Sequence, residues 1–138
     1  MENIISSDKA PEPVGPYPHA RKVGNLLFLS GVGPRKRGSK EIPGVTLDAK
    51  GKVISYNIDE QCYSVFENVK NILEASGSKW ENLVDVTVFL TNMDDFPAYN
   101  KVYKTYFPDP ATQPCRTTVA VIALPTPIAI ELKCIATV

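Results

Sequence analysis

Residues 113–138 have the sequence QPCRTTVAVIALPTPIAIELKCIATV, a largely apolar segment with two prolines near its middle. The pattern predicts two buried strands joined by a turn at residues 125–127. Two charges stand out within it, because Arg116 lies at the start of the first strand and Glu131 in the middle of the second. Apolar residues alternate along one face of the second strand, so Glu131 is expected to point to the other face.

A carboxylate in the middle of an apolar strand needs a partner, water or a chemical role. One interpretation is a structural ion pair between Arg116 and Glu131. The other is an active site, since charges in unusual surroundings tend to mark functional positions. The spacing of the two residues alone leaves both interpretations open.

Length and composition narrow the classes of protein to consider. A chain of 138 residues suits a single domain, residues 1–138, with its own core. The 15 basic and 15 acidic residues cancel, which argues against binding to nucleic acid or to a membrane surface through overall charge. No apolar run approaches the roughly 18 residues that span a bilayer, and the N-terminus lacks a secretory pattern.

The cysteine and histidine content gives two further expectations. Three widely spaced cysteines, Cys62, Cys115 and Cys134, do not form the pattern of a disulfide framework, so we expect a cytoplasmic location. A single histidine without a nearby cysteine group gives little basis for a metal site, and none is expected.

Residue patterns predict a mixed α+β architecture. Residues 20–23 and 26–30 flank Gly24-Asn25 as in a hairpin, and the continuously apolar Leu26–Leu29 suggests a strand covered on both faces. Helices are expected at residues 57–76 and, after Asn92, at residues 93–107, with a strand at 83–91 between them. Residues 1–19 are rich in proline and are expected to be irregular. This order predicts a mixed β-sheet with two helices packed on one face, whose second face is covered by oligomerisation.

Several short motifs occur in an order that is found in one known family. The C-terminal motifs are Pro114-x-Arg116-Thr117 and Ile130-Glu131. Earlier motifs are Gly15-Pro16-Tyr17, Ser30-Gly31, Asn68-Val69-Lys70 and Asp95-Phe96-x-x-x-Asn100-x-x-Tyr103. Each motif is short, but the ordered set covers nearly the whole chain. The sequence resembles the RidA/YjgF family of reactive-intermediate deaminases, which act on enamines and imines.

This resemblance implies a chorismate-mutase-like (RidA) fold and a homotrimer with active sites between subunits. It implies that Arg116 binds a substrate carboxylate and that Glu131 positions water. It also implies pocket positions for Tyr17, Ser30 and Asn100, and a backbone contact from Gly31. Two positions depart from the family pattern: Thr118 replaces a frequent cysteine, and His19 replaces a frequent glutamine.

The two charges suit such chemistry on physical grounds. A guanidinium binds a carboxylate through two parallel hydrogen bonds, and a neighbouring carboxylate can hold or deprotonate a water molecule. The expected partner is therefore a small-molecule carboxylate whose adjacent C=N carbon is attacked by that water. No cofactor is expected, because an imine is already electrophilic.

The polar loop at residues 34–45 bears on the choice of substrate. Its three consecutive cations, Arg35, Lys36 and Arg37, could form a solvated face. The segment also resembles that of the 2-aminomuconate deaminase branch, whose substrate carries two carboxylates, so Arg35 and Arg37 are candidate substrate-binding residues. The leading hypothesis is deamination of 2-aminomuconate to 4-oxalocrotonate and ammonia in the degradation of aromatic compounds. The alternatives are a general 2-iminoacid/enamine deaminase and a non-catalytic, ligand-binding regulatory trimer.

Overall fold

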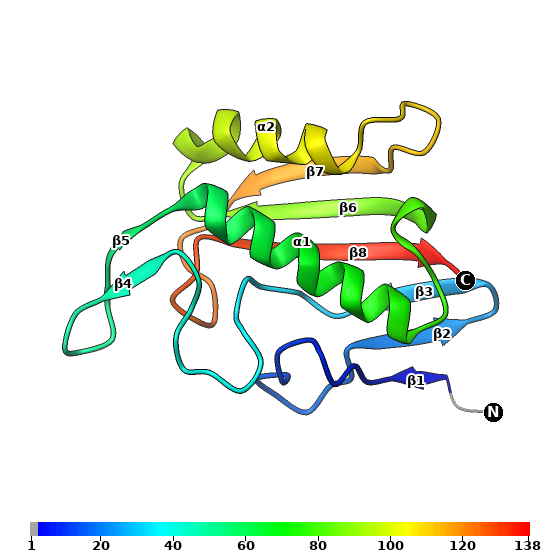
Figure 1. Ribbon diagram of the computed structural model, residues 1–138, viewed down its shortest axis with the longest axis horizontal. Coiled ribbons are helices and arrows are strands. Elements are labelled where there is room, and N and C mark those ends of the chain that lie inside the picture. Colours follow the sequence, from blue (N-terminus) through cyan, green and yellow to red (C-terminus); the bar gives the residue numbers. More distant parts are fainter. Residues whose placement is uncertain (1–2) are drawn as a thin grey trace.

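The apolar C-terminal segment forms β8 (Ile130–Thr137), in the interior of a six-stranded sheet. The computed structural model describes residues 3–138 (Figure 1). The order of strands is β1-β2-β3-β8-β6-β7, and every neighbouring pair is antiparallel except β6 and β7. The other five strands are β1 (Ile4–Ile5), β2 (Ala20–Val23), β3 (Leu26–Leu29), β6 (Leu83–Leu90) and β7 (Cys115–Ala120).

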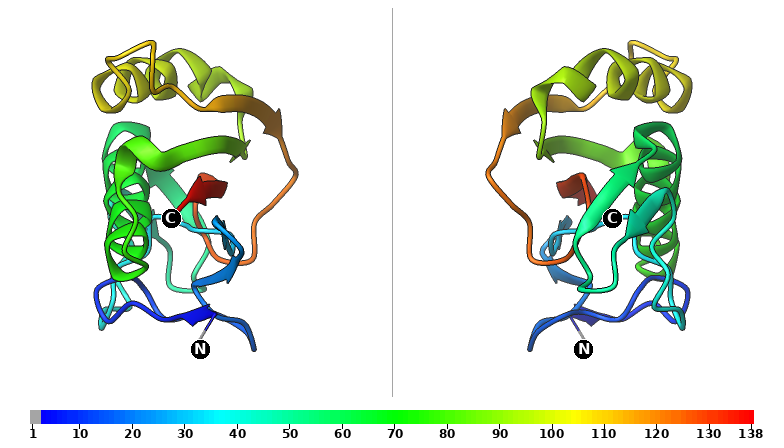
Figure 2. Two further views of the ribbon diagram at one scale, coloured as in Figure 1. Left: turned by 90° about the vertical axis from the view of Figure 1, so that its right-hand side faces the viewer. Right: turned by 90° about the vertical axis from the view of Figure 1, so that its left-hand side faces the viewer.

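Two helices cover one face of this sheet (Figures 1 and 2). Helix α1 (Ile58–Ala75) begins at Asn57, whose side chain accepts a hydrogen bond from the Glu60 N–H at 3.1 Å, as an N-cap does. Helix α2 (Phe96–Tyr106) follows the short 3₁₀ helix η2 (Met93–Asp95) and lies beside β7. The apolar side of α1 packs on β8, and its buried apolar residues are Cys62, Val65, Phe66, Val69, Ile72 and Leu73.

The α+β architecture with two helices and a mixed sheet is confirmed. In the single chain the predicted buried strand at Cys115–Ala120 is mostly exposed, and the cover of the second sheet face by oligomerisation stays a prediction. β7 is an edge strand with mostly exposed residues, and β6 lies between it and β8. In β3, Leu27 and Leu29 are fully buried, whereas Leu26 and Phe28 remain 37% and 36% exposed. The helices cover only one face of each strand, so an apolar residue on the other face stays open.

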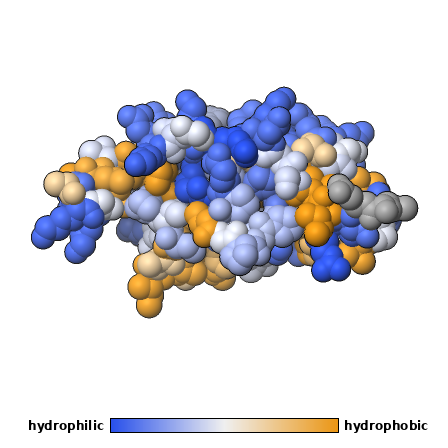
Figure 3. Space-filling model, turned by 90° about the horizontal axis from the view of Figure 1, so that it is seen from below, coloured by the Kyte–Doolittle hydropathy of each residue, from blue (hydrophilic) through white to orange (hydrophobic). Residues whose placement is uncertain are grey.

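The open face of the sheet carries a group of apolar side chains. By strand register, Phe28, Ile135, Phe89 and Val119 all lie on the face away from the helices. In the edge-on view of Figure 3, hydrophobic atoms protrude along the lower edge, which is the side opposite the helices. Such a surface is typical of a protein contact.

Three short strands were not predicted from the sequence. β1 pairs with β2, so the proline-rich N-terminal segment is not irregular throughout; Met1 and Glu2 lie outside the described residues. β4 (Val45–Leu47) and β5 (Val53–Tyr56) form a separate hairpin with a register shift. Across residues 3–138, neither α-helix combines the length and hydrophobicity that a bilayer crossing requires.

Candidate active site

Glu131 lies half-buried on the open face of β8, as its position in the alternating pattern predicts. Gly31 packs against its carboxyl group: a Cβ atom at position 31 would lie 3.1 Å from both Cδ and Oε2 of Glu131. The absence of a side chain at Gly31 therefore leaves room for the carboxylate beside the backbone. Lys133 is the next residue on the same face of β8. Its ammonium group donates a hydrogen bond to the Leu29 carbonyl oxygen.

The surroundings of Glu131 raise the pKa of its carboxyl group. Burial is the main cause, because it disfavours the charged form, and the nearby Arg35 charge opposes the effect. Among residues 3–138, no lysine or arginine forms an ion pair with this carboxylate. A carboxyl group whose pKa is raised toward neutrality is a better general base than an ordinary surface glutamate.

Four of the predicted site residues line one pocket, which Gly31 connects to Glu131, although Glu131 itself is not among the lining residues. They are Tyr17, Ser30, Gly31 and Arg35. The Ser30 hydroxyl donates to the Pro18 carbonyl oxygen at 2.7 Å, and the Tyr17 hydroxyl accepts from the Val14 N–H at 3.3 Å. The volume of this pocket is about 20 Å³, whereas one water molecule needs about 10–15 Å³. Within a single chain the pocket is therefore water-sized.

Arg116 forms a second group with residues of α2. Its Nη1 donates to Oδ1 of Asn100 at 2.8 Å, so Asn100 orients the guanidinium. The guanidinium carbon also lies 4.6 Å from the centre of the Tyr103 ring, a cation–π distance. Further aromatic contacts come from Phe96 and Tyr99.

Three hydroxyl groups near Arg116 are notable because they are buried without a hydrogen-bond partner among residues 3–138. They belong to Tyr99, Tyr103 and Thr118. Burial also raises the pKa of Tyr103 to about 12, so this hydroxyl keeps its proton at neutral pH. The aromatic residues of α2 looked like ordinary core in the sequence, and only the position of Arg116 above them reveals their contact with the guanidinium.

The Arg116 group and the Glu131 group do not meet within one chain. Arg116 pairs in register with Val86, and Glu131 with Phe89, the residue three further along β6. Val86 faces the helices and Phe89 faces away, so the two charged side chains lie on opposite faces of the sheet. Strand spacing and rise place their Cα atoms roughly 14 Å apart. The interpretation of Arg116 and Glu131 as a structural ion pair is therefore wrong within one chain.

The cationic loop contributes to the pocket unequally. Arg35 lines the pocket, and its Nη2 donates to the Glu12 carbonyl oxygen at 2.6 Å. Arg37 is directed to the N-terminal segment instead, where its Nη1 donates to the carbonyl oxygens of Ser7 and Ala10. Lys36 between them is exposed. Two of the three cations therefore bind backbone carbonyl groups of the N-terminal segment, and the loop is not simply a charged surface exposed to solvent.

His19 is a pocket-lining residue for which the sequence suggested no role. It is buried, its Nδ1 accepts from the Ser7 N–H at 2.9 Å, and its Nε2 lies 2.7 Å from the Pro11 carbonyl oxygen. The carbonyl can only accept, so Nε2 carries the proton. Both ring nitrogens are therefore engaged by backbone groups.

Comparison with known proteins identifies the family of the chain. The model of one family, described as Endoribonuclease L-PSP, matches residues 7–138. The chain belongs to this RidA/YjgF (L-PSP) family. Reactive Intermediate Deaminase A of Arabidopsis thaliana is 38% identical over 136 residues, covering 99% of this chain and 66% of that longer protein.

Two further members of the RidA/YjgF family are similar along nearly their whole length. The 2-iminobutanoate/2-iminopropanoate deaminase of Dermatophagoides farinae is 37% identical over 135 residues, covering 97% of this chain and 94% of that protein. The solved structure of E. coli TdcF with bound serine superimposes with a TM-score of 0.84 at 32% identity, covering 99% of each chain. Family membership and fold are thus established together.

We predict that the Glu131 carboxyl titrates above the ordinary range of a glutamate. The substitution Arg35→Gln should raise its pKa further, because it removes a charge that favours the ionised form. A carbon-detected NMR titration of the side-chain carboxyl measures both effects. Lys36→Gln is the matched control, since Lys36 is exposed. If Arg35→Gln leaves the pKa where it was, Arg35 does not act on this carboxylate.

Proposed function

We propose that this protein is a hydrolytic deaminase of enamines and imines that carry a carboxylate next to the C=N carbon. The observation that carries the proposal is Glu131, a half-buried carboxylate with a raised pKa beside a pocket of water size. The deaminases named among the relatives support the same reaction class. A protein that only bound a carboxylate through Arg116 would have little use for the second charge, that of Glu131.

In the proposed mechanism Arg116 binds the substrate carboxylate through its guanidinium, held in orientation by Asn100. Glu131 takes a proton from water as the water oxygen bonds to the C=N carbon. The imine nitrogen takes up that proton, which gives a tetrahedral adduct with one hydroxyl and one amino group. The hydroxyl proton then passes to the amino nitrogen as the C=O bond forms, the C–N bond breaks, and ammonia leaves. Imine and water thus give a ketone and ammonia, without a cofactor.

We further propose that the active site is completed between subunits of a homotrimer. Arg116 and Glu131 lie on opposite faces of one sheet, so a substrate that touches both must bridge two copies of the chain. A contact between two different faces is head-to-tail, and such contacts close into a ring when the rotation permits. The open apolar face, which includes Phe28 and Val119, supports this assembly.

The substrate we favour within this class is 2-aminomuconate, which would yield 4-oxalocrotonate during the degradation of aromatic compounds. Arg116 can hold only one of its two carboxylates. Arg35 lines the pocket near Glu131 and has further donors besides Nη2, so it is our candidate for the far carboxylate. A general 2-iminoacid deaminase is the alternative if Arg35 has no such role.

Cleavage of RNA, which the family description names, finds less support in this chain. Its sole histidine, His19, has both ring nitrogens engaged by backbone groups. The formal net charge is zero, which provides no general attraction for a phosphate backbone.

We predict that Glu131→Gln lowers kcat about 10²–10⁴-fold while leaving KM nearly unchanged, because the general base is lost and the shape is kept. Folding should not suffer. A folded-state pKa raised above the unfolded value contributes stability that is lost as pH rises through the folded-state pKa, so the ionised form of Glu131 does not stabilise the fold. Ammonia release from 2-iminopropanoate measures the rate, and near-normal turnover would remove Glu131 from the mechanism.

For substrate selectivity, we predict that Arg35→Gln raises the KM for 2-aminomuconate about ten- to a hundred-fold more than the KM for 2-iminopropanoate. The expected factor corresponds to the loss of one charge-assisted hydrogen bond, about 1.5–3 kcal/mol. Lys36→Gln should change neither constant, because Lys36 is exposed. Equal effects of Arg35→Gln on both substrates would favour the general deaminase.

A further inference from the structure

The segment from Ser7 to Pro18, here called the N-terminal arm, lies outside the regular strands of the sheet. It contains four prolines, Pro11, Pro13, Pro16 and Pro18, which have no backbone N–H to donate. Its carbonyl groups must therefore find donors elsewhere if the arm is to keep one position.

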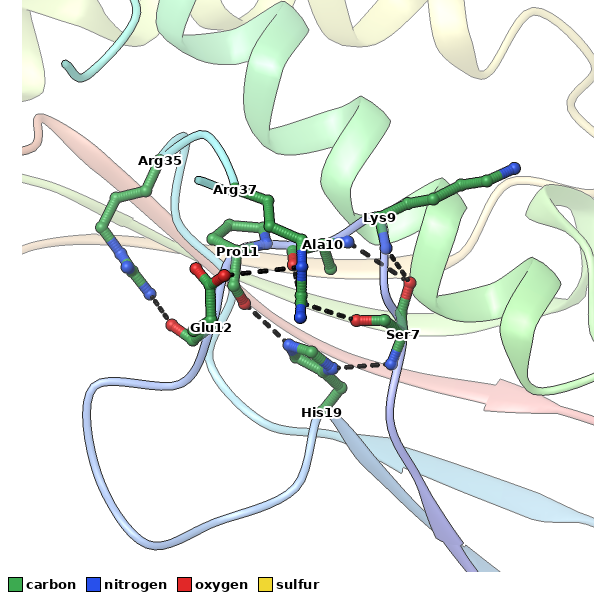
Figure 4. Close-up of polar contacts among 8 residues, drawn as sticks. All are labelled: Ser7, Lys9, Ala10, Pro11, Glu12, His19, Arg35 and Arg37. Atoms are coloured by element: carbon green, nitrogen blue, oxygen red, sulfur yellow. Dashed lines mark hydrogen bonds and ion pairs between the residues drawn. The ribbon is translucent and has the colours of Figure 1, made fainter. Parts of the chain in front are cut away.

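Arg37 supplies such donors from the loop after β3 (Figure 4). Its Nη1 donates to the carbonyl oxygens of Ser7 at 3.0 Å and Ala10 at 2.8 Å. Its Nε lies 3.4 Å from Oε1 of Glu12, a salt bridge at a partly exposed position. One guanidinium thus ties three positions of the arm to the loop.

The arm is also tied to the pocket from its other side. Ser7 is buried, and its N–H donates to Nδ1 of His19, while its Oγ accepts from the N–H groups of Lys9 and Ala10 (Figure 4). His19 in turn contacts the carbonyl oxygen of Pro11 through Nε2. The His19 carbonyl oxygen accepts from the Ser30 N–H at 3.0 Å, which links this network to a pocket residue.

The arm forms one wall of the pocket next to Glu131. The arm contributes Ala10, Pro11, Pro13 and Tyr17 to its lining, the segment after β3 contributes Ser30, Gly31, Val32 and Gly33, and α1 contributes Ile72. At about 20 Å³ the pocket is narrow, so a small movement of the arm changes its width by a large fraction. The contacts that set the position of the arm therefore set the shape of the site.

We infer that Arg37 is a positioning residue, which holds the N-terminal arm as a wall of the site and does not contact the substrate. The structural part of this inference is independent of the activity, and its kinetic part rests on the proposed deaminase function. Arg37 and Arg35 then have separate roles, although they lie two residues apart on one loop. Arg35 affects one class of substrate, whereas Arg37 affects all substrates alike.

Hydrogen exchange tests the structural part with Arg37→Gln and, as the matched control, Lys36→Gln. In Arg37→Gln the amides of Ser7, Lys9 and Ala10, which donate within the network, should exchange about tenfold faster or more, as expected for lost charge-assisted hydrogen bonds. The amides of α1 and β8 should be unchanged. Lys36→Gln should match the parent protein. Unchanged exchange of the arm in Arg37→Gln would overturn the inference.

Kinetics test the second part on the same variants. Arg37→Gln should lower kcat/KM by a similar factor for 2-aminomuconate and for 2-iminopropanoate, and Arg37→Lys should restore only part of it, because an ammonium lacks the guanidinium fork. A loss confined to 2-aminomuconate would mean that Arg37 contacts the far carboxylate. Unchanged or increased kcat/KM despite faster exchange of the arm would also overturn the positioning role.

The two measurements separate failure of this inference from failure of the proposed function. If the parent protein releases no ammonia from either substrate, the proposed function fails, and the exchange experiment still decides whether Arg37 holds the arm. If the parent is active and the arm is unaffected by Arg37→Gln, the positioning role fails alone.

Discussion

The alternation of side chains along β8 is the constraint on which the rest of the molecule depends. Ile130, Leu132 and Cys134 face the helices and are fully buried or nearly so. The same alternation sends Glu131 to the open face, where Gly31 leaves room for its carboxyl group. The core and the chemistry thus share one strand: the residues that bury β8 under α1 hold the carboxylate in the surroundings that raise its pKa.

A second consequence of the sheet is that the chain carries two incomplete halves of a site. The Arg116 half is assembled between β7 and α2, with Asn100 as its orienting partner. The Glu131 half is assembled between β8, the turn after β3 and the N-terminal arm. The open apolar face lies on the side of the Glu131 half. An enzyme assembled from several copies of this chain would bring the halves together and cover that face at once.

The sequence predicted what depends on local periodicity and failed where burial depends on distant segments. The apolar face of α1 follows from the helical repeat, and the orientation of the Glu131 side chain follows from the strand repeat. Both predictions are confirmed. The exposed residues of the open face include Leu26, Phe28 and Val119, which are as apolar as core residues. A sequence pattern therefore cannot tell whether such a side chain packs under the chain's own helices or against another copy of the chain. The role of Arg37 was similarly hidden, because its acceptors, the carbonyl groups of Ser7 and Ala10, lie 30 and 27 residues away.

The central claim is that one active site combines Arg116 of one subunit with Glu131 of another. Mixing unfolded Arg116→Ala and Glu131→Gln chains, refolding them together and measuring ammonia release tests it directly. Mixed oligomers would contain interfaces in which both residues are intact, so the account predicts activity well above that of either variant refolded alone. Activity equal to the sum of the two separate variants, in oligomers shown to be mixed, would contradict it.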